Sequence, residues 1–231
     1  MQTHTEIRTP ALRHPAPPPR GASPICNPAL PGAIELTGFL NSYPPDNEIF
    51  GENEPAKYLY KVVSGCVRTY RMLESGRRQI AAIYVPGEVF GFETRDEHTL
   101  SAETISECTL LLMKRSALAK TAELENVVAR QLCTLTVAEL RRMQDHILLL
   151  GKLAHERVAG FLVEMAQRLS VDDTVELTMS RQDIADYLGL TVETVSRSFT
   201  HLENAATIKM LTSRRIVLRN YAALVRLSAG S

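Results

Sequence analysis

The feature that most constrains the fold of this 231-residue chain is the stretch 180–204, with the sequence SRQDIADYLGLTVETVSRSFTHLEN. Its pattern predicts two short helices joined by a tight turn. Ser180 and Asp183 have the spacing of a capping box, which starts a helix. Gly189 can adopt the left-handed conformation that a sharp helix end needs, and Thr191 can cap the helix that follows. We therefore expect a helix-turn-helix here.

The second of these helices is predicted to have two different faces. One face is apolar and is expected to pack on the core: Val195, Phe199 and Leu202. The other face is polar near the start of the helix, where core packing does not require it: Glu193, Ser196 and Arg197. A helix-turn-helix with such side chains at the N-terminal end of its second helix is typical of proteins that read base edges in the DNA major groove.

Charge is distributed unevenly, although the chain has a formal net charge of zero. From residue 197 to the C-terminus there are six Lys or Arg residues and a single acid, Glu203. Such an excess of cations suits a surface that faces DNA phosphates, although a solvated charged face is the simpler alternative. The charge pattern therefore agrees with the DNA-binding motif.

Short apolar runs after the motif predict a small β-hairpin, with residues 208–211 and 215–218 on either side of the turn 212–214. A hairpin in this place makes the helix-turn-helix a winged one. Before the motif, a further amphipathic helix is expected at residues 152–169.

A long helix without proline or glycine is predicted from residue 123 to 150. Four apolar residues in it recur at spacings of 3, 4 and 3: Leu140, Met143, Ile147 and Leu150. This pattern indicates a coiled-coil seam. We expect it to form a dimer interface, because DNA readers of this kind bind two half-sites; packing on the helix's own domain is the alternative. Cys133 lies on the same helix, where oxidation could alter pairing, although a buried small residue is the simpler explanation.

The N-terminal half divides into two parts. Residues 1–32 contain eight of the twelve prolines, so this tail is expected to be disordered or extended, either passive or a proline-rich ligand for a partner. Residues 33–122 show short strands broken by glycine turns, which predicts a β-sandwich or barrel. With a dimerisation helix at 123–150 and a DNA-binding domain at 151–231, the chain is predicted to have an α+β fold.

Several other classes of protein fit the sequence poorly. No run approaches the roughly 18 apolar residues of a membrane span, and the N-terminus lacks the apolar core of a secretory signal, so a cytoplasmic location without membrane contact is expected. The four cysteines have no CxxC spacing, and nothing supports a metal site. A metal-barrel enzyme would need His ligands on facing strands, but between residues 58 and 114 the only histidine is the loop residue His98. We therefore do not expect an enzyme.

Given these patterns, the chain resembles the CRP/FNR superfamily of bacterial transcription regulators over about residues 55–220. The similarity is carried by three stretches: LYKVVSGCVRTY (59–70) with GRRQI (76–80) and VPGEVFGF (85–92); QDHILLLGK (144–152) with Glu156-Arg157; and VETVSR (192–197). The last matches the FNR and FixK branch. The resemblance implies an N-terminal antiparallel β-roll like a cyclic-nucleotide-binding domain, a long dimerisation helix and a C-terminal winged helix-turn-helix.

The resemblance also implies a mode of DNA reading. Arg197 would bond O6 and N7 of a guanine, and Glu193 would accept from N4 of a cytosine. Ser196 would approach a thymine edge, and Val192 would contact a thymine methyl group. In this branch such residues go with sites of the type TTGAT–N4–ATCAA. Candidates for phosphate contacts are Ser180, Arg181, Thr191, Thr194 and Arg214.

Partners and cofactors follow from the same comparison. We expect a homodimer that activates low-oxygen, nitrogen-fixation or denitrification genes by contacting RNA polymerase. FNR proteins hold an iron–sulfur cluster through clustered cysteines, but the tail has only Cys26, so no cluster is expected. Members that bind cyclic AMP use a Gly-Glu-Leu motif and an Arg-Ser pair, where this chain has Gly91-Phe92-Glu93 and Leu100-Ser101. We expect no cofactor; an effector-gated regulator with an unidentified ligand, or haem, in the β-roll is the alternative.

Overall fold

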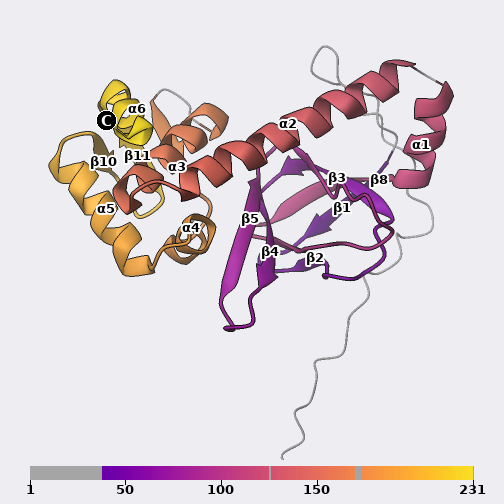
Figure 1. The fold of residues 1–231 in the computed structure, drawn as a ribbon, viewed down its shortest axis with the longest axis horizontal. Helices are drawn as coiled ribbons and strands as arrows, with labels where there is room; N and C mark the ends of the chain where they lie inside the picture. The colour runs from indigo at the N-terminus through magenta and orange to yellow at the C-terminus, as the bar shows by residue number, and fades with distance from the viewer. Residues whose placement is uncertain (1–37, 125, 170–172, 231) are drawn as a thin grey trace, which may run out of the picture.

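The computed structural model describes residues 38–124, 126–169 and 173–230. The proline-rich tail expected at residues 1–32 lies outside the described residues. Figure 1 shows a β-rich part and a helical part joined by one long helix that lies across the β-rich part. The α+β fold class expected from the sequence is confirmed.

The β-rich part is a roll of two antiparallel four-stranded sheets. The first has the order β1-β8-β3-β6 and consists of Phe39–Tyr43, Cys108–Lys114, Tyr58–Ser64 and Val89–Phe90. The second has the order β2-β7-β4-β5 and consists of Glu48–Phe50, Ser101–Thr104, Val67–Met72 and Arg78–Tyr84. Alternate residues of a strand face the same side, so both sheets contribute apolar side chains to one core, among them Val62, Val67 and Phe90.

Two helices follow the roll, α1 (Arg115–Leu124) and α2 (Asn126–Leu150). α2 packs on the roll through apolar contacts that include Leu132. The Tyr84 hydroxyl of the roll also donates a hydrogen bond to Glu139 on α2 at 2.9 Å. Although α2 has 25 residues, neither it nor any other helix within the described ranges is apolar enough to cross a membrane.

The helical part is the predicted winged helix-turn-helix. Its elements are α3 Ala154–Leu169, β9 Thr174–Glu176, α4 Arg181–Leu188, α5 Val192–Asn204, β10 Ile208–Met210, β11 Arg215–Leu218 and α6 Tyr221–Ala229. The hairpin of β10 and β11 is the wing, and β9 pairs with β11 to complete a small sheet. The apolar face of α5 is buried as expected, because Val195, Phe199 and Leu202 pack into the core.

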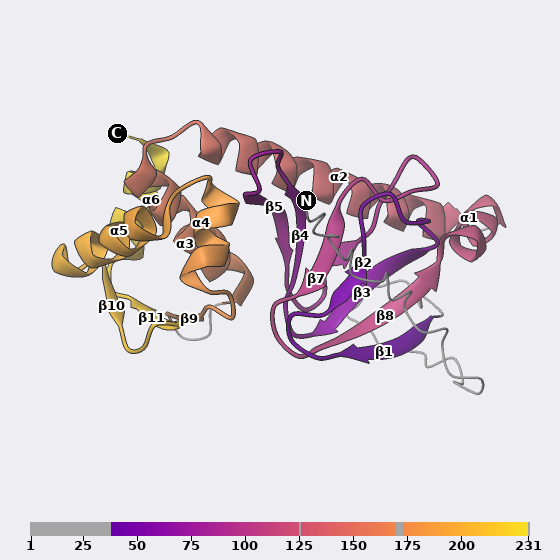
Figure 2. The same cartoon turned by 90° about the horizontal axis from the view of Figure 1, so that it is seen from below.

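The two parts of the molecule share a continuous apolar core. Cys66, Ile80 and Ile83 of the roll belong to the same cluster of buried side chains as Phe161 of α3 and Tyr187 of α4. Figure 1 and Figure 2 both show β5 beside α4. The helical part is therefore docked against the roll, in addition to its connection through α2.

Candidate nucleic-acid interface

The first helix of the motif, α4, begins and ends as the sequence predicts. The Ser180 hydroxyl accepts a hydrogen bond from the Asp183 backbone N–H at 3.1 Å, and the Asp183 carboxylate accepts one from the Ser180 N–H at 3.0 Å. This is a complete capping box. Gly189 ends the helix with a φ of 63°, in the left-handed region. The capping box thus fixes where α4 begins, and the left-handed Gly189 fixes the direction in which the chain leaves α4 toward α5.

The second helix, α5, presents the polar residues that the sequence analysis singled out. Thr191 caps it by accepting from the Thr194 N–H at 3.2 Å. Glu193, Ser196 and Arg197 are all exposed on its first two turns. In both Figure 1 and Figure 2, α5 lies on the side of α4 remote from the roll, at one end of the molecule. The helix is therefore accessible to a large ligand such as a DNA duplex.

The Glu193 carboxyl is held in its ionised form. Its own backbone N–H and the Thr191 hydroxyl donate to it, and these hydrogen bonds lower its pKa. An ionised carboxylate only accepts hydrogen bonds, which suits an amino group on a base edge. The same negative charge stabilises the N-terminal end of α5 through the helix dipole.

Val192 differs from its polar neighbours. It opens α5 but is half-buried, and its side chain packs against the core. Only part of this side chain is available for an apolar contact with another molecule.

Arg181 lies beside a small cavity between α4, α5 and the wing. Its guanidinium stacks on Phe199, with Cζ 3.4 Å from the ring centroid, and Nη1 is buried with no hydrogen-bond partner among the described residues. Burial lowers the pKa of this guanidinium. The cavity has a volume of about 310 Å³ and a mostly apolar surface, to which four hydroxyl residues contribute: Ser196, Thr200, Thr212 and Ser213. The Thr200 and Thr212 hydroxyls are bonded to backbone groups, so the unpaired group here is the Arg181 guanidinium.

Three of these hydroxyl residues, Thr200, Thr212 and Ser213, were missed from the sequence. Thr200 meets Arg181 because α5 packs on α4, whereas Thr212 and Ser213 meet it because the wing folds back toward α5, a contact that no local pattern reveals. A polar turn in a predicted wing was the only available signal.

The other predicted phosphate contacts surround the start of α5 and the wing. The Ser180 hydroxyl is committed to Asp183, to which it donates at 2.7 Å. Thr191 and Thr194 share a hydroxyl–hydroxyl hydrogen bond of 3.0 Å at the start of α5. Arg214 is exposed in the turn of the wing. These residues therefore lie in three places: at the start of α4, at the start of α5 and in the turn of the wing.

The long helix α2 carries a row of exposed apolar side chains. Four of them lie between residues 137 and 148 and are 55% to 68% exposed: Val137, Leu140, Ile147 and Leu148. They line a shallow hollow of about 610 Å³ along the helix. Leu140 and Ile147 were expected there, whereas Val137 and Leu148 were not.

The other residues predicted for the seam of α2 lie differently. Met143 is exposed and, like Leu140, also lines a cavity between α2 and the roll. Leu150 is half-buried, with its side chain close to Gly189 of the helix-turn-helix. Cys133 is a free, exposed thiol on α2, so the simpler explanation of a buried small residue is wrong for the single chain.

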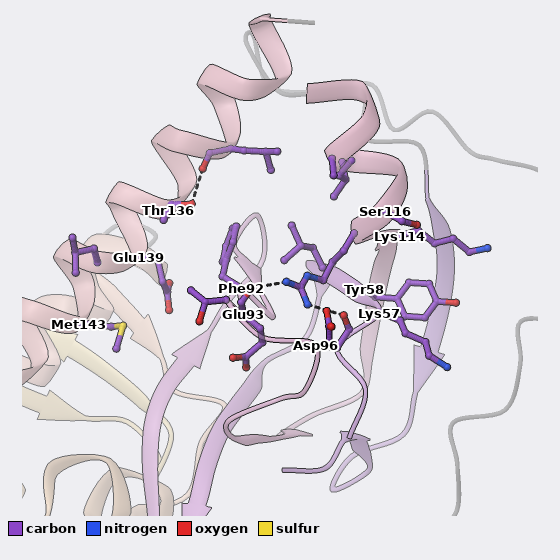
Figure 3. Close-up of a pocket in the computed structure, with 18 residues that line it drawn as sticks. Lys57, Tyr58, Phe92, Glu93, Asp96, Lys114, Ser116, Thr136, Glu139 and Met143 are labelled. Carbon is purple, nitrogen blue, oxygen red and sulfur yellow. Dashed lines mark hydrogen bonds between the residues drawn. The ribbon is translucent and has the colours of Figure 1, made fainter. Parts of the chain in front are cut away.

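The cavity between α2 and the roll has a volume of about 1060 Å³. Figure 3 shows Glu139 and Met143 of α2 on one side of it, and Phe92, Glu93 and Asp96 on the other. Its size suits a small organic ligand.

The charged side chains that line this cavity are of both signs, with Lys57, Lys114 and Arg115 beside Glu93, Asp96 and Glu139. The Arg115 guanidinium is bonded to the backbone carbonyls of Ala56, Glu93 and Arg95. Leu100, which stands where the family resemblance places a phosphate-binding arginine, is not one of the residues that line this cavity. The guanidinium of Arg115 is thus already partnered, and the other cations of the lining are the ammonium groups of Lys57 and Lys114.

The loop that contains His98 is less exposed than its polar sequence indicates. His98 is only 1% exposed and stacks on Phe50, with the ring centroids 3.5 Å apart. Burial lowers the pKa of the imidazole, although Glu93 lies 3.6 Å from its Nδ1. Within the described ranges, no group of three or more His, Cys, Asp or Glu side chains is placed to hold a metal ion.

Comparison with known proteins accounts for both parts of the molecule. Residues 156–227 match the model of the Crp-like helix-turn-helix domain, and residues 40–125 match that of the cyclic nucleotide-binding domain.

Curated relatives match most of the chain. The nitrogen fixation regulation protein FixK of Azorhizobium caulinodans is 48% identical over 190 residues, which are 80% of this chain and 77% of that protein. FixK of Rhizobium meliloti is 38% identical over 88% of this chain and 90% of its own length. The solved structure of FixK2 from Bradyrhizobium japonicum superposes with a TM-score of 0.82 and 49% identity, covering 85% of this chain and all of that one.

Proposed function

The chain belongs to the CRP/FNR superfamily of transcription regulators and is FixK-like, and on this premise we propose that it binds palindromic DNA sites of the type TTGAT–N4–ATCAA as a homodimer. The observation that carries the proposal is the exposed cluster of Glu193, Ser196 and Arg197 at the start of α5. Their donors and acceptors match the base edges of such a half-site.

Each of these side chains has its own partner in the proposed half-site. The Arg197 guanidinium donates two hydrogen bonds, to O6 and N7 of a guanine. The ionised Glu193 carboxylate accepts from the N4 amino group of a cytosine, and the Ser196 hydroxyl approaches a thymine edge. The accessible part of Val192 contacts a thymine methyl group.

Phosphate contacts would hold this helix in register on the duplex. Arg181, whose Nη1 has no hydrogen-bond partner among the described residues, lines the small cavity beside the wing and would contact one phosphate group. Arg214 on the wing and the start of α5 at Thr191 and Thr194 would meet the neighbouring backbone. These contacts carry affinity but no sequence information.

A palindromic site requires two copies of the chain. The exposed apolar row on α2 supports pairing through this helix, because burying such a row against a second copy removes it from water. Parallel pairing of two α2 helices would place two α5 helices on one face of the DNA, as two adjacent half-sites require.

The names of the relatives point to the genes under control. FixK is a nitrogen fixation regulation protein in Azorhizobium and Rhizobium. We therefore propose that this chain regulates nitrogen-fixation, denitrification or other low-oxygen genes, as an activator that contacts RNA polymerase while bound to DNA. A catalytic activity forms no part of this proposal, since the relatives are transcription regulators.

A gel-shift experiment tests the DNA site. The purified protein is titrated against a TTGAT–N4–ATCAA probe and against a probe with one half-site altered, each with and without oxygen. We expect strong binding to the intact probe only. The affinity should be the same with and without oxygen, because the expected mechanism uses no iron–sulfur cluster. Equal affinity for the two probes would refute the half-site assignment.

One observation favours a second candidate, a regulator gated by a ligand in the roll. The cavity of about 1060 Å³ lies between the roll and α2, so a ligand there would touch both the roll and the proposed dimer helix. An unidentified organic molecule or haem would have to supply the signal. DNA binding by the purified protein without any added effector would exclude this alternative.

A further inference from the structure

A cluster of charged side chains joins the β4–β5 hairpin of the roll to α4 of the DNA-binding domain. Arg68 on β4 contacts Asp183 at 3.1 Å, and Arg78 on β5 contacts the same Asp183 oxygen at 2.7 Å. Arg78 also contacts Asp186, one turn further along α4, at 3.0 Å. We call Arg68, Arg78, Asp183 and Asp186 the interdomain clamp. Glu103 on β7 supports it from the roll, at 2.8 Å from Arg68.

The two oxygens of the Asp183 carboxylate bind different parts of the molecule. Oδ1 of Asp183 accepts from both arginines, while Oδ2 accepts from the Ser180 N–H and hydroxyl that cap α4. One carboxylate thus ties the roll to the N-terminal end of α4. In addition, the Gln79 amide of β5 donates to the backbone carbonyl of Asp186 at 2.8 Å. Both the start and the middle of α4 are therefore held in a defined orientation.

The clamp is also largely removed from water. The side chains of Arg68 and Asp183 are only 7% and 5% exposed. Buried ion pairs contribute little net stability, because desolvation offsets their attraction, but they demand good geometry. A buried, hydrogen-bonded cluster of this kind is thus better suited to setting an orientation than to raising overall stability.

We propose that Arg68 and Arg78 are positioning residues for DNA recognition, which hold α4 and thereby set the spacing between the two half-sites without a bound effector. α4 is joined to α5 by the short turn 189–191, so a rotation of α4 on the roll moves the recognition helix with it. In a dimer the α5 helices of both copies would move, so their two displacements would add in the distance between them. This inference rests on the proposed function of the chain as a dimeric DNA reader.

The test compares Arg78→Gln with a matched control, Arg77→Gln. Arg77 is the neighbouring residue of the same hairpin and is exposed. Each full-length protein is titrated by fluorescence anisotropy against probes with four or six base pairs between the half-sites. The wild-type and Arg77→Gln proteins should prefer the four-base-pair probe, and Arg78→Gln should lose about tenfold of this preference.

The ratio between the two probes separates positioning from stability. A variant that is merely less stable lowers the active fraction equally on both probes, so its ratio stays at the wild-type value. Asp186→Asn removes the other side of the same contact and should reduce the ratio in the same way. A wild-type ratio in Arg78→Gln and Asp186→Asn would overturn the proposal.

Solution X-ray scattering tests the clamp independently of the DNA site. If the wild-type protein did not prefer TTGAT probes, the proposed half-site would be wrong, but the clamp would still make a prediction. Releasing α4 from the roll should increase the radius of gyration of full-length Arg78→Gln and leave that of Arg77→Gln at the wild-type value. Equal radii in all three proteins would overturn the clamp.

Discussion

Arg197 is the single residue on which base recognition is expected to depend most. It is exposed on α5, and its substitution by alanine would remove both hydrogen bonds to a guanine. We expect Arg197→Ala to weaken binding by about 1–3 kcal/mol per half-site and to relax the preference at that base pair. Anisotropy titrations with the palindromic probe measure the change.

Arg226→Ala is the control, because it removes the same charge from an exposed position on α6. Wild-type affinity in Arg197→Ala would refute the assigned contact.

Arg181 should affect affinity without affecting sequence preference. Its unpaired Nη1, at the cavity between α4, α5 and the wing, predicts a contact with a phosphate, which carries no base information. In Arg181→Gln, the slope of log K against log salt concentration should fall by about 1 per protomer. The ratio of affinities for the intact and altered half-sites should stay constant. An unchanged slope would mean that Arg181 does not reach the DNA backbone.

Among the elements, α2 is the one whose exposed apolar row calls for a partner. A charge in the middle of this row would have to be buried without a counter-ion if two α2 helices paired. We expect Ile147→Glu to shift the protein from dimer to monomer in analytical ultracentrifugation and to weaken binding to the palindrome. Ala138→Glu introduces the same charge at another exposed position of α2, outside the row, and should stay dimeric. A dimeric Ile147→Glu protein would place the interface elsewhere.

The junction of α2 with α4 should make stability depend on pH. His146 on α2 stacks on Tyr187 of α4, with the ring centroids 4.0 Å apart, and burial lowers its pKa to about 4. Between about pH 4 and 6.5, His146 is protonated in the unfolded chain, where its pKa is near 6.5, but neutral in the folded chain. Stability should therefore fall as the pH is lowered from about 6.5 to 4, by roughly 1–2 kcal/mol after allowance for partial exposure of the ring.

Urea unfolding at several pH values measures this effect. His146→Phe keeps an aromatic ring against Tyr187 but cannot be protonated, so it should lose this part of the pH dependence. If the variant and the wild-type protein had the same pH dependence, His146 would not be its source.

Over the whole molecule, features set by neighbouring residues could be predicted from the sequence, whereas contacts between distant residues could not. The capping box at Ser180 and the left-handed Gly189 are set by neighbouring residues, so the helix-turn-helix was predicted correctly. The contact of Arg68 with Asp183 joins residues 115 positions apart, and no periodicity encodes it. On α2, the apolar spacing predicts the seam, but a one-dimensional pattern cannot show that Leu140 and Met143 also line a cavity against the roll.

The roll as a whole matches the model of a cyclic nucleotide-binding domain but has no arginine at the position that the family resemblance assigns to the phosphate. Leu100 stands where the family resemblance places an arginine, and the Arg115 guanidinium is already bonded to three backbone carbonyls. The remaining cations that line this cavity are the single ammonium groups of Lys57 and Lys114, which cannot replace the two-pronged contact of a guanidinium with a phosphate. We therefore expect that cyclic AMP at about 1 mM changes neither the melting temperature of the protein nor its affinity for the palindromic probe.

The sensitivity of this measurement is sufficient to decide between the two modes of control. A ligand present at a hundredfold excess over its Kd stabilises a folded protein by about 2.7 kcal/mol, which shifts the melting temperature of a chain of this size by several degrees. A flat response would agree with DNA binding that depends on the interdomain clamp and on the amount of protein alone. A clear rise in melting temperature, coupled to tighter DNA binding, would show that the cavity beside α2 receives a nucleotide despite its missing arginine, and would favour the effector-gated alternative.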